Sequence, residues 1–178
     1  MIELIDNLTE WLQENVCNGL KFKKPSNRGD SGYEYELVKP TAYSCFCPPQ
    51  EKSNLPQSPS ITVQIDNFSD DLPNESVVNI ALVFSVWNTG THDNREEPKF
   101  EKNLDGWRDL WHFMDKARKE IREHLNIAGY ELKSAINGRS LAGESSILGT
   151  YPYFFGEITF TIGTINSINT SVNIRKLL

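Results

Sequence analysis

Cysteine is scarce in this sequence, and long apolar runs are absent. The three cysteines are Cys17, Cys45 and Cys47. An odd number of cysteines in a chain without a visible export signal predicts free thiols in a reducing compartment. The opening stretch "MIELIDNLTEWLQ" has no basic start and is interrupted by acidic residues, so no signal peptide is expected. No apolar run is long enough to span a bilayer, so no membrane partner is expected either.

Positive charge is also limited. The chain has 18 Lys and Arg against 24 Asp and Glu, which gives a net charge of -6. This balance argues against a protein that coats nucleic acid, because such binding needs clustered basic side chains. The length of 178 residues is enough for one domain with a sizeable core.

The hydrophobic periodicity predicts an α+β fold. Apolar residues at helical spacing predict an N-terminal helix, and the positions are Ile2, Ile5, Leu8, Leu12 and Val16. Residues 20–47 look extended, with alternation at 33–37 that predicts one buried face. Residues 61–66 and 76–88 alternate as core strands and predict an antiparallel pair. Residues 130–136 and 151–163 also read as strands, whereas 48–60 and 137–150 read as loops. We expect a single domain over residues 1–162, built on a mainly antiparallel sheet with helices on one face.

Residues 104–125 predict a long amphipathic helix. At about 100° per residue, one sector is apolar and is expected to pack on the sheet; its members are Trp107, Leu110, Trp111, Met114, Ala117, Ile121 and Leu125. His112 points away from this sector. Glu120 can pair with Lys116 and with His124, each one turn away. The interpretation is a packing helix with a salt-bridged outer face.

The candidate chemical groups do not assemble into a catalytic or metal-binding motif. His112 and His124 are too far apart on one helix to share a metal, since ligands there lie one turn apart. Cys45 and Cys47 lack the second pair that zinc sites use and read as thiols on a half-buried strand. His92 and Asp93 could do acid–base work, but nothing fixes their geometry. We therefore expect no enzyme activity, no cofactor and no bound metal.

Two segments are suited to joining subunits. Residues 88–102 form a long polar stretch without periodicity, and such loops in compact domains often serve a function. Residues 163–178 contain no acidic residue and read as a C-terminal arm or edge strand, which could add to a partner's sheet or stay disordered in a monomer. The candidate interface residues are Asn88, His92, Asp93, Arg95, Phe100, Ile165, Ile168, Val172 and Ile174.

The order of these elements resembles the tail terminator and tail-completion (neck) proteins of long-tailed bacteriophages. The resemblance covers most of residues 1–162. It rests on the proline-led strand at 59–66, "VFSVWN" at 83–88, "GWRDL" at 106–110 and "PYFFGEITF" at 152–160. Residues 33–49 are longer than the simplest members have, and the C-terminal residues have no obvious counterpart.

The resemblance implies a structural virion protein. Such a protein caps the tail tube, stops its polymerisation and forms the head-joining surface, commonly as a hexameric ring. The implied partners are further copies of the chain, the tail tube protein and the head–tail connector protein, with DNA passing through the lumen. The implied location is the virion tail or neck, after assembly in the bacterial cytoplasm. Another neck or baseplate adaptor remains an alternative, and so does a small enzyme or ligand-binding domain around His92 and the cysteines.

Overall fold

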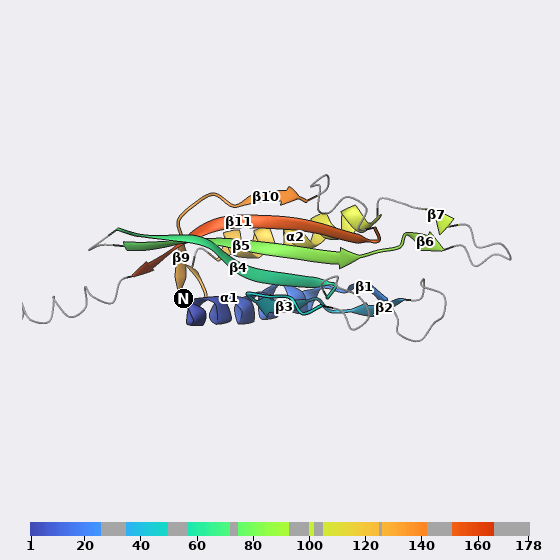
Figure 1. Ribbon diagram of the computed structural model, residues 1–178, viewed down its shortest axis with the longest axis horizontal. Helices are drawn as coiled ribbons and strands as arrows, with labels where there is room; N and C mark the ends of the chain where they lie inside the picture. Colours follow the sequence, from blue (N-terminus) through green and yellow to red (C-terminus); the bar gives the residue numbers. More distant parts are fainter. Residues whose placement is uncertain are drawn as a thin grey trace, which may run out of the picture.

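The computed structural model describes residues 1–25, 35–49, 57–71, 75–92, 100–101, 105–124, 126–141 and 151–165. Within these residues the chain forms an elongated sheet with two helices packed on one of its faces (Figure 1). The predicted α+β class is therefore confirmed. The helical elements are α1 (Ile2–Asn15), the 3₁₀ turn η1 (Cys17–Gly19) and α2 (Asp105–Glu123). The strands are β1 (Phe22–Pro25), β2 (Tyr35–Val38), β3 (Thr41–Ser44), β4 (Ser60–Asp71), β5 (Glu75–Trp87), β6 (Thr91–His92), β7 (Phe100–Glu101), β8 (Asn126–Ile127), β9 (Tyr130–Leu132), β10 (Asn137–Ser140) and β11 (Tyr153–Ile165).

The main sheet has the strand order β3-β4-β5-β11-β9-β8, with β10 also paired to β11. Its centre is the predicted antiparallel pair of β4 and β5, extended by the antiparallel pairing of β5 with β11. The sheet is mixed, however, because β3 runs parallel to β4. Thr41 and Ser60 start the two strands side by side, so the chain between them must return along the sheet. The prediction of a mainly antiparallel sheet did not include this parallel pair, although residues 45–59 are long enough for such a return.

The core lies between this sheet and the two helices. The even-numbered residues of β5 are buried there, as the alternation predicted; they are Val78, Ile80, Leu82, Phe84 and Val86. The predicted face of β11 is buried beside them, namely Phe154, Ile158, Phe160 and Ile162. Helix α1 covers β3 and β4, whereas α2 covers β5 and β11. The two helices thus share one continuous apolar cluster.

The predicted buried sector of α2 is partly wrong. Trp111 is 48% exposed, whereas Phe113 is fully buried. The Phe113 ring lies between Phe22 of β1 and Phe84 of β5, with centroid distances of 5.0 and 5.1 Å. Strand β1 therefore covers a side of α2 that lay outside the predicted apolar sector, and the buried sector rotates away from Trp111. The remaining described members of the predicted sector are buried or half-buried, and His112 is exposed as expected.

Two strand predictions are also wrong. Tyr35 and Leu37 were expected on a buried face but are 48% and 59% exposed. They belong to the β1–β2 hairpin, which in the described part of the chain forms a separate two-stranded sheet. Residues 137–140, expected in a loop, form β10 on β11. The Arg139 Nε donates a 2.8 Å hydrogen bond to Glu157 Oε2, which ties the side chains of the two strands.

Glycine at position 156 allows α2 to lie close to β11. A Cβ there would stand 2.5 Å from the Met114 sulfur and 3.3 Å from both the Arg139 carbonyl oxygen and Leu110 Cδ1. Contacts under 3.0 Å force neighbouring atoms to move, and here the neighbours are already packed. The close approach of helix and sheet thus depends on the missing side chain.

Gly156→Ala is expected to lower the free energy of unfolding by about 1–3 kcal/mol, as overpacked cores do. Gly138→Ala is the matched control, because Gly138 is another strand glycine beside Met114. Its Cβ would meet Met114 Cε at 3.5 Å, an ordinary contact. Urea denaturation of both variants measures the difference, and equal losses would contradict the close approach.

Candidate functional site

Of the predicted interface residues, the structure describes Asn88, His92 and Phe100 at one end of the sheet and Ile165 at the other. Asn88 follows β5 and is only 3% exposed. His92 and Phe100 are backbone partners in a short ribbon, because β6 pairs antiparallel with β7. Residues 88–102 are thus not a simple loop. Ile165 is the last residue of β11, paired with Glu75, so β11 continues into the segment expected as an arm. The predictions for Asp93, Arg95, Ile168, Val172 and Ile174 fall outside the described residues.

Asn88 joins three parts of the chain at the end of β5. Its side-chain nitrogen donates a 2.6 Å hydrogen bond to Asp109 Oδ2 of α2. Its side-chain oxygen accepts from the Gly90 N–H at 2.8 Å and from Lys23 Nζ of β1 at 3.2 Å. The Lys23 ammonium also donates to the Gly90 carbonyl oxygen at 3.3 Å. This Asn88 cluster (Lys23, Asn88, Gly90 and Asp109) fixes the point where the β6–β7 ribbon leaves the sheet.

Opposing electrostatic effects act on the pKa of the Asp109 carboxyl in the Asn88 cluster. Burial raises the pKa of the Asp109 carboxyl, whereas the hydrogen bond from Asn88 and the charge of Lys23 lower it. Burial is the largest of these effects. The hydrogen bond from Asn88 and the charge of Lys23 favour the charged form of this carboxyl against the effect of burial. The cluster holds β1, the end of β5 and α2 together. The sequence analysis named Asn88 as a candidate interface residue and did not predict its burial.

One end of the molecule presents two apolar side chains on β2. Tyr35 and Leu37 are exposed, and they define what we term the hairpin surface. The Lys23 ammonium lies 4.8 Å from the centroid of the Tyr35 ring, within range of a cation–π contact. The hairpin surface lies near the β6–β7 ribbon, at the same end of the sheet (Figure 1).

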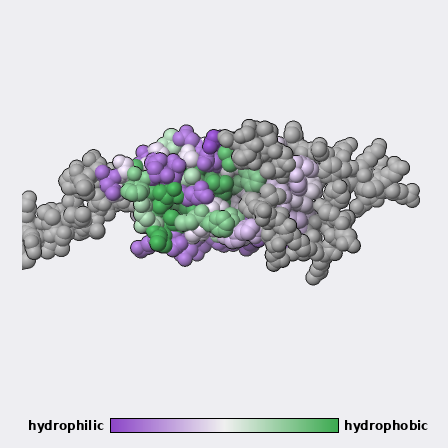
Figure 2. Space-filling model, viewed as in Figure 1, coloured by the Kyte–Doolittle hydropathy of each residue, from purple (hydrophilic) through white to green (hydrophobic). Residues whose placement is uncertain are grey.

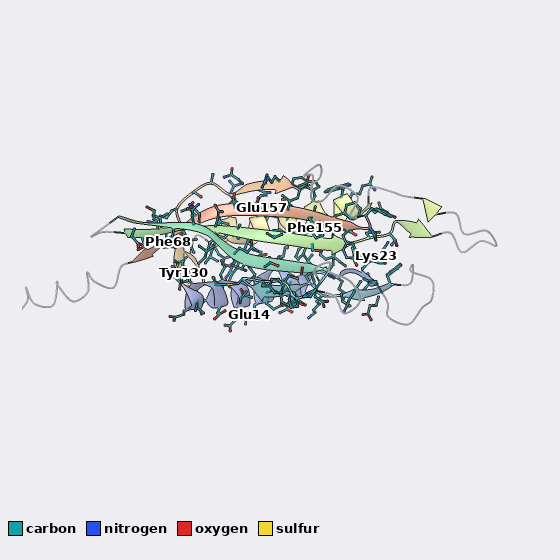
Figure 3. All side chains as sticks on the ribbon, in the orientation of Figure 1. Glu14, Lys23, Phe68, Tyr130, Phe155 and Glu157 are labelled. Carbon is teal, nitrogen blue, oxygen red and sulfur yellow. The ribbon has the colours of Figure 1, made fainter. Side chains whose placement is uncertain are left out.

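The opposite end presents a second apolar group. Met1 and Ile2 at the start of α1 are 56% and 78% exposed, and Phe68 of β4 is 55% exposed. We term these three residues the tip surface, because they lie toward the end where β4 and β5 turn (Figures 1 and 3). In Figure 2, this end of the molecule shows apolar residues in green beside polar residues in purple. Large exposed apolar side chains of this kind mark interaction sites when they gather.

A β-bulge directs Phe68 to the helix-bearing face. Before the bulge Ile65 pairs with Ile80, and after it Phe68 pairs with Val78. Cross-strand partners share a face, so Phe68 lies on the face of the buried Val78. Simple alternation from Ile65 would have placed Phe68 on the other face. The sequence carries no clear sign of the bulge, and sequence reasoning therefore missed this residue.

The other face of the sheet is polar at the base of the β4–β5 hairpin. The Asn79 side-chain nitrogen donates to Asn67 Oδ1 at 2.5 Å, and Thr161 Oγ1 donates to Asn79 Oδ1 at 2.6 Å. The Thr161 N–H donates to Ser134 Oγ at 2.8 Å. Asn79, Ser134 and Thr161 border a hollow of about 300 Å³. Because Asn67, Asn79 and Thr161 bond one another across three strands, they act as a clamp that holds the hairpin to the sheet.

The predicted chemical groups come from different parts of the chain, and the side chains of His92 and Asp93 lie outside the described residues. Strand β3 ends at Ser44, and Cys45 follows with a φ of 60°, so the prediction of two thiols on one strand is wrong. The Cys45 N–H bonds the Val63 carbonyl beside the middle of β5, whereas His92 comes after the end of β5. The described residues contain no group of three or more His, Cys, Asp or Glu side chains that could hold a metal.

The ion pairs predicted on the outside of α2 are confirmed. Lys116 contacts Glu120, and His124 Nδ1 lies 3.8 Å from Glu120 Oε2. Asp115, one turn from His112, instead pairs with Arg118 and Lys119, at 2.7 Å in each case. Hydrogen bonds from these two cations lower the pKa of the Asp115 carboxyl. Both histidine-bearing turns therefore carry ion pairs, which are exposed at Asp115 and half-buried at Glu120.

The three cysteines are free thiols, as predicted, but differ in exposure. Cys17 is fully buried, and burial raises its pKa to about 12. At pH 8 it therefore has almost no thiolate, the reactive form. We expect Cys45 to react with a thiol reagent in the native protein and Cys17 to react only after unfolding. Mass spectrometry of native and urea-unfolded samples measures this, with Cys45→Ser as the control. Native labelling of Cys17 at the rate of Cys45 would contradict its burial.

No protein-family model matches the sequence, and no curated protein matches it. Among the helices in the described ranges, neither is long and apolar enough to cross a membrane.

Proposed function

We propose that this protein is a tail terminator of a long-tailed bacteriophage. In this role it caps the tail tube as a ring, stops tube polymerisation and forms the surface that joins the head. The observation that carries the proposal is the pair of apolar surfaces at opposite ends of one elongated domain (Figure 1). The resemblance of the sequence to tail terminator proteins supports the same role.

A ring needs two different surfaces on each subunit. In a head-to-tail ring, one surface of a subunit meets another surface of the next, and the rotation closes. The hairpin surface and the tip surface suit this arrangement, because each exposes apolar side chains and they lie at opposite ends of the sheet. The rigid sheet between them would set the angle between neighbours.

Charge also supports the proposal. The chain has a net charge of -6. A ring of such subunits repels the phosphates of DNA passing through its lumen, so the DNA is not held there. The partners in this role are the tail tube protein on one side and the head–tail connector protein on the other. A related neck or baseplate ring is the second candidate, because two apolar end surfaces would serve that ring equally.

The proposal is tested in a phage lacking this gene. Electron microscopy of the lysate is expected to show overlong tail tubes or tails that have not joined heads, and the wild-type gene should restore normal virions. A baseplate role would instead give no tubes at all. Tails of normal length joined to heads without the gene would overturn the proposal.

Surface variants test the two ends separately. Leu37→Glu and Phe68→Glu each place a charge on one apolar surface and should fail to complement. Trp111→Glu is the matched control, because Trp111 is also an exposed apolar residue but lies on α2 between the ends. Complementation by both end variants would remove these surfaces as the ring contacts.

A further inference from the structure

Within the described part of the chain, strand β4 has an open edge over its second half. Strand β3 pairs with β4 only from Ser60 to Val63, and the Cys45 N–H then bonds the Val63 carbonyl. From Gln64 onward, no strand in the described ranges lies on this side of β4, whereas β5 pairs with it on the other side as far as Asp71. Residues 64–70 are exposed except for Ile65, which is half-buried.

An open strand edge can accept a further strand. Alternate residues of an edge strand direct their backbone N–H and C=O groups outward, and another extended chain can bond to them. Natural edges of this kind are usually short, covered or protected by lysine. This one carries two acidic residues, Asp66 and Asp70, together with the exposed Phe68. The edge is therefore suited to an extended segment with basic and apolar side chains.

The C-terminal segment of this chain has those properties. Residues 166–178 contain Arg175 and Lys176 and no acidic residue. Between 168 and 174 every second residue is apolar apart from Thr170, in the order Ile168, Val172 and Ile174, and the residues between them are Asn and Ser. Leu177 and Leu178 end the segment outside this alternation. Such period-two alternation is typical of a strand with one apolar and one polar face.

The place where β11 ends favours a neighbouring copy as the acceptor. Ile165 is the residue opposite Glu75, and Asp71 is opposite Glu75 on the other side. Residues 166–178 therefore start at the tip of the β4–β5 hairpin. Strands β11 and β4 run in the same direction, with β5 between them. To reach its own β4 edge the segment would have to reverse and cross β5, whereas the edge of another copy needs no reversal.

We propose that residues 166–178 of one copy add as a strand to the open edge of β4, residues 64–70, in the next copy. The inference adds a contact between subunits to the one between the hairpin and tip surfaces, and it rests on the ring of the proposed function. Backbone hydrogen bonds would provide the affinity, and apolar residues beside Phe68 would set the register. The positive charge of Arg175 and Lys176 would lie near the acidic stretch that carries Asp66 and Asp70.

The test uses the full-length protein and measures hydrogen–deuterium exchange of peptides covering residues 64–70. Across a concentration series, exchange in this stretch should slow as the protein associates, while exchange elsewhere on β4 stays constant. Sedimentation velocity on the same samples reports the association itself. Protection that does not depend on concentration would mean that the segment pairs within its own chain, which overturns the proposal. Unchanged exchange over the whole series overturns it as well.

A charge swap provides the control. Asp66→Lys with Asp70→Lys should weaken self-association about tenfold, and Arg175→Glu with Lys176→Glu should do the same. The four substitutions together should restore it, because the attraction is re-formed with opposite signs. Failure of the restoration would contradict this pairing. It would leave the tail-length phenotype of the gene deletion unaffected, so the two proposals are tested independently.

Discussion

Phe113→Ala is expected to lower the free energy of unfolding by about 3–5 kcal/mol, as loss of a buried aromatic ring does. Phe113 is fully buried, and its ring lies between Phe22 and Phe84. The substitution would leave a cavity where β1, β5 and α2 meet. The midpoint of urea denaturation measures the loss.

Trp111→Ala, two residues away on the same helix, is the matched control. Trp111 is 48% exposed, so its removal should change stability by roughly 0.5 kcal/mol or less. A loss for Trp111→Ala that equals the loss for Phe113→Ala would mean that α2 packs in the phase the sequence predicted. That result would contradict the observed position of β1 over the helix.

Asn88→Asp is expected to destabilise the protein by about 2–4 kcal/mol at pH 7, because it breaks a buried polar network and places two carboxylates together. The side chain at 88 would lose its donor to Asp109 and face it with a like charge, 2.6 Å from the present nitrogen position. Repulsion would raise the folded-state pKa of the carboxyl pair above its unfolded value. The loss should therefore be small below about pH 4 and grow as the pH rises through the raised pKa.

The reciprocal exchange provides the control. In Asn88→Asp with Asp109→Asn, the amide at 109 donates to the carboxylate at 88. That carboxylate also accepts from the Gly90 N–H and lies beside Lys23, as the Asn88 oxygen does now. The double variant should regain most of the stability, and Asn137→Asp on the surface should change little. A double variant as unstable as Asn88→Asp would show that the network does not work as described.

The sequence predicted the parts of the fold that depend on regular alternation. The buried faces of β5 and β11 follow from period-two patterns over long strands, which tolerate no change of register without exposing the core. The N-terminal helix and the long helix were predicted for the same kind of reason. The errors fall where one element is covered by a short partner from far away in the chain. Phe22 covers Phe113 across the fold, and no local pattern records that contact.

The candidate interaction surfaces could be predicted from the sequence to a smaller extent than the buried faces. Phe68 is exposed on the helix-bearing face because of a bulge, and Asn88 is buried because Lys23 and Asp109 converge on it. Each position is decided by partners distant in the sequence. Composition identified the C-terminal segment as a possible joining element, since its alternation and its lack of acidic residues can be read directly. The acceptor edge could be recognised only after the short extent of β3 was known.

The location of the protein in the virion is the most direct test of the proposed role. Immunogold electron microscopy, with antibodies against the whole chain, should place gold only at the junction of tail tube and head, and on the upper end of tubes that lack heads. Gold along the length of the tube, at the distal baseplate, or absent from virions would contradict the role of a tail terminator.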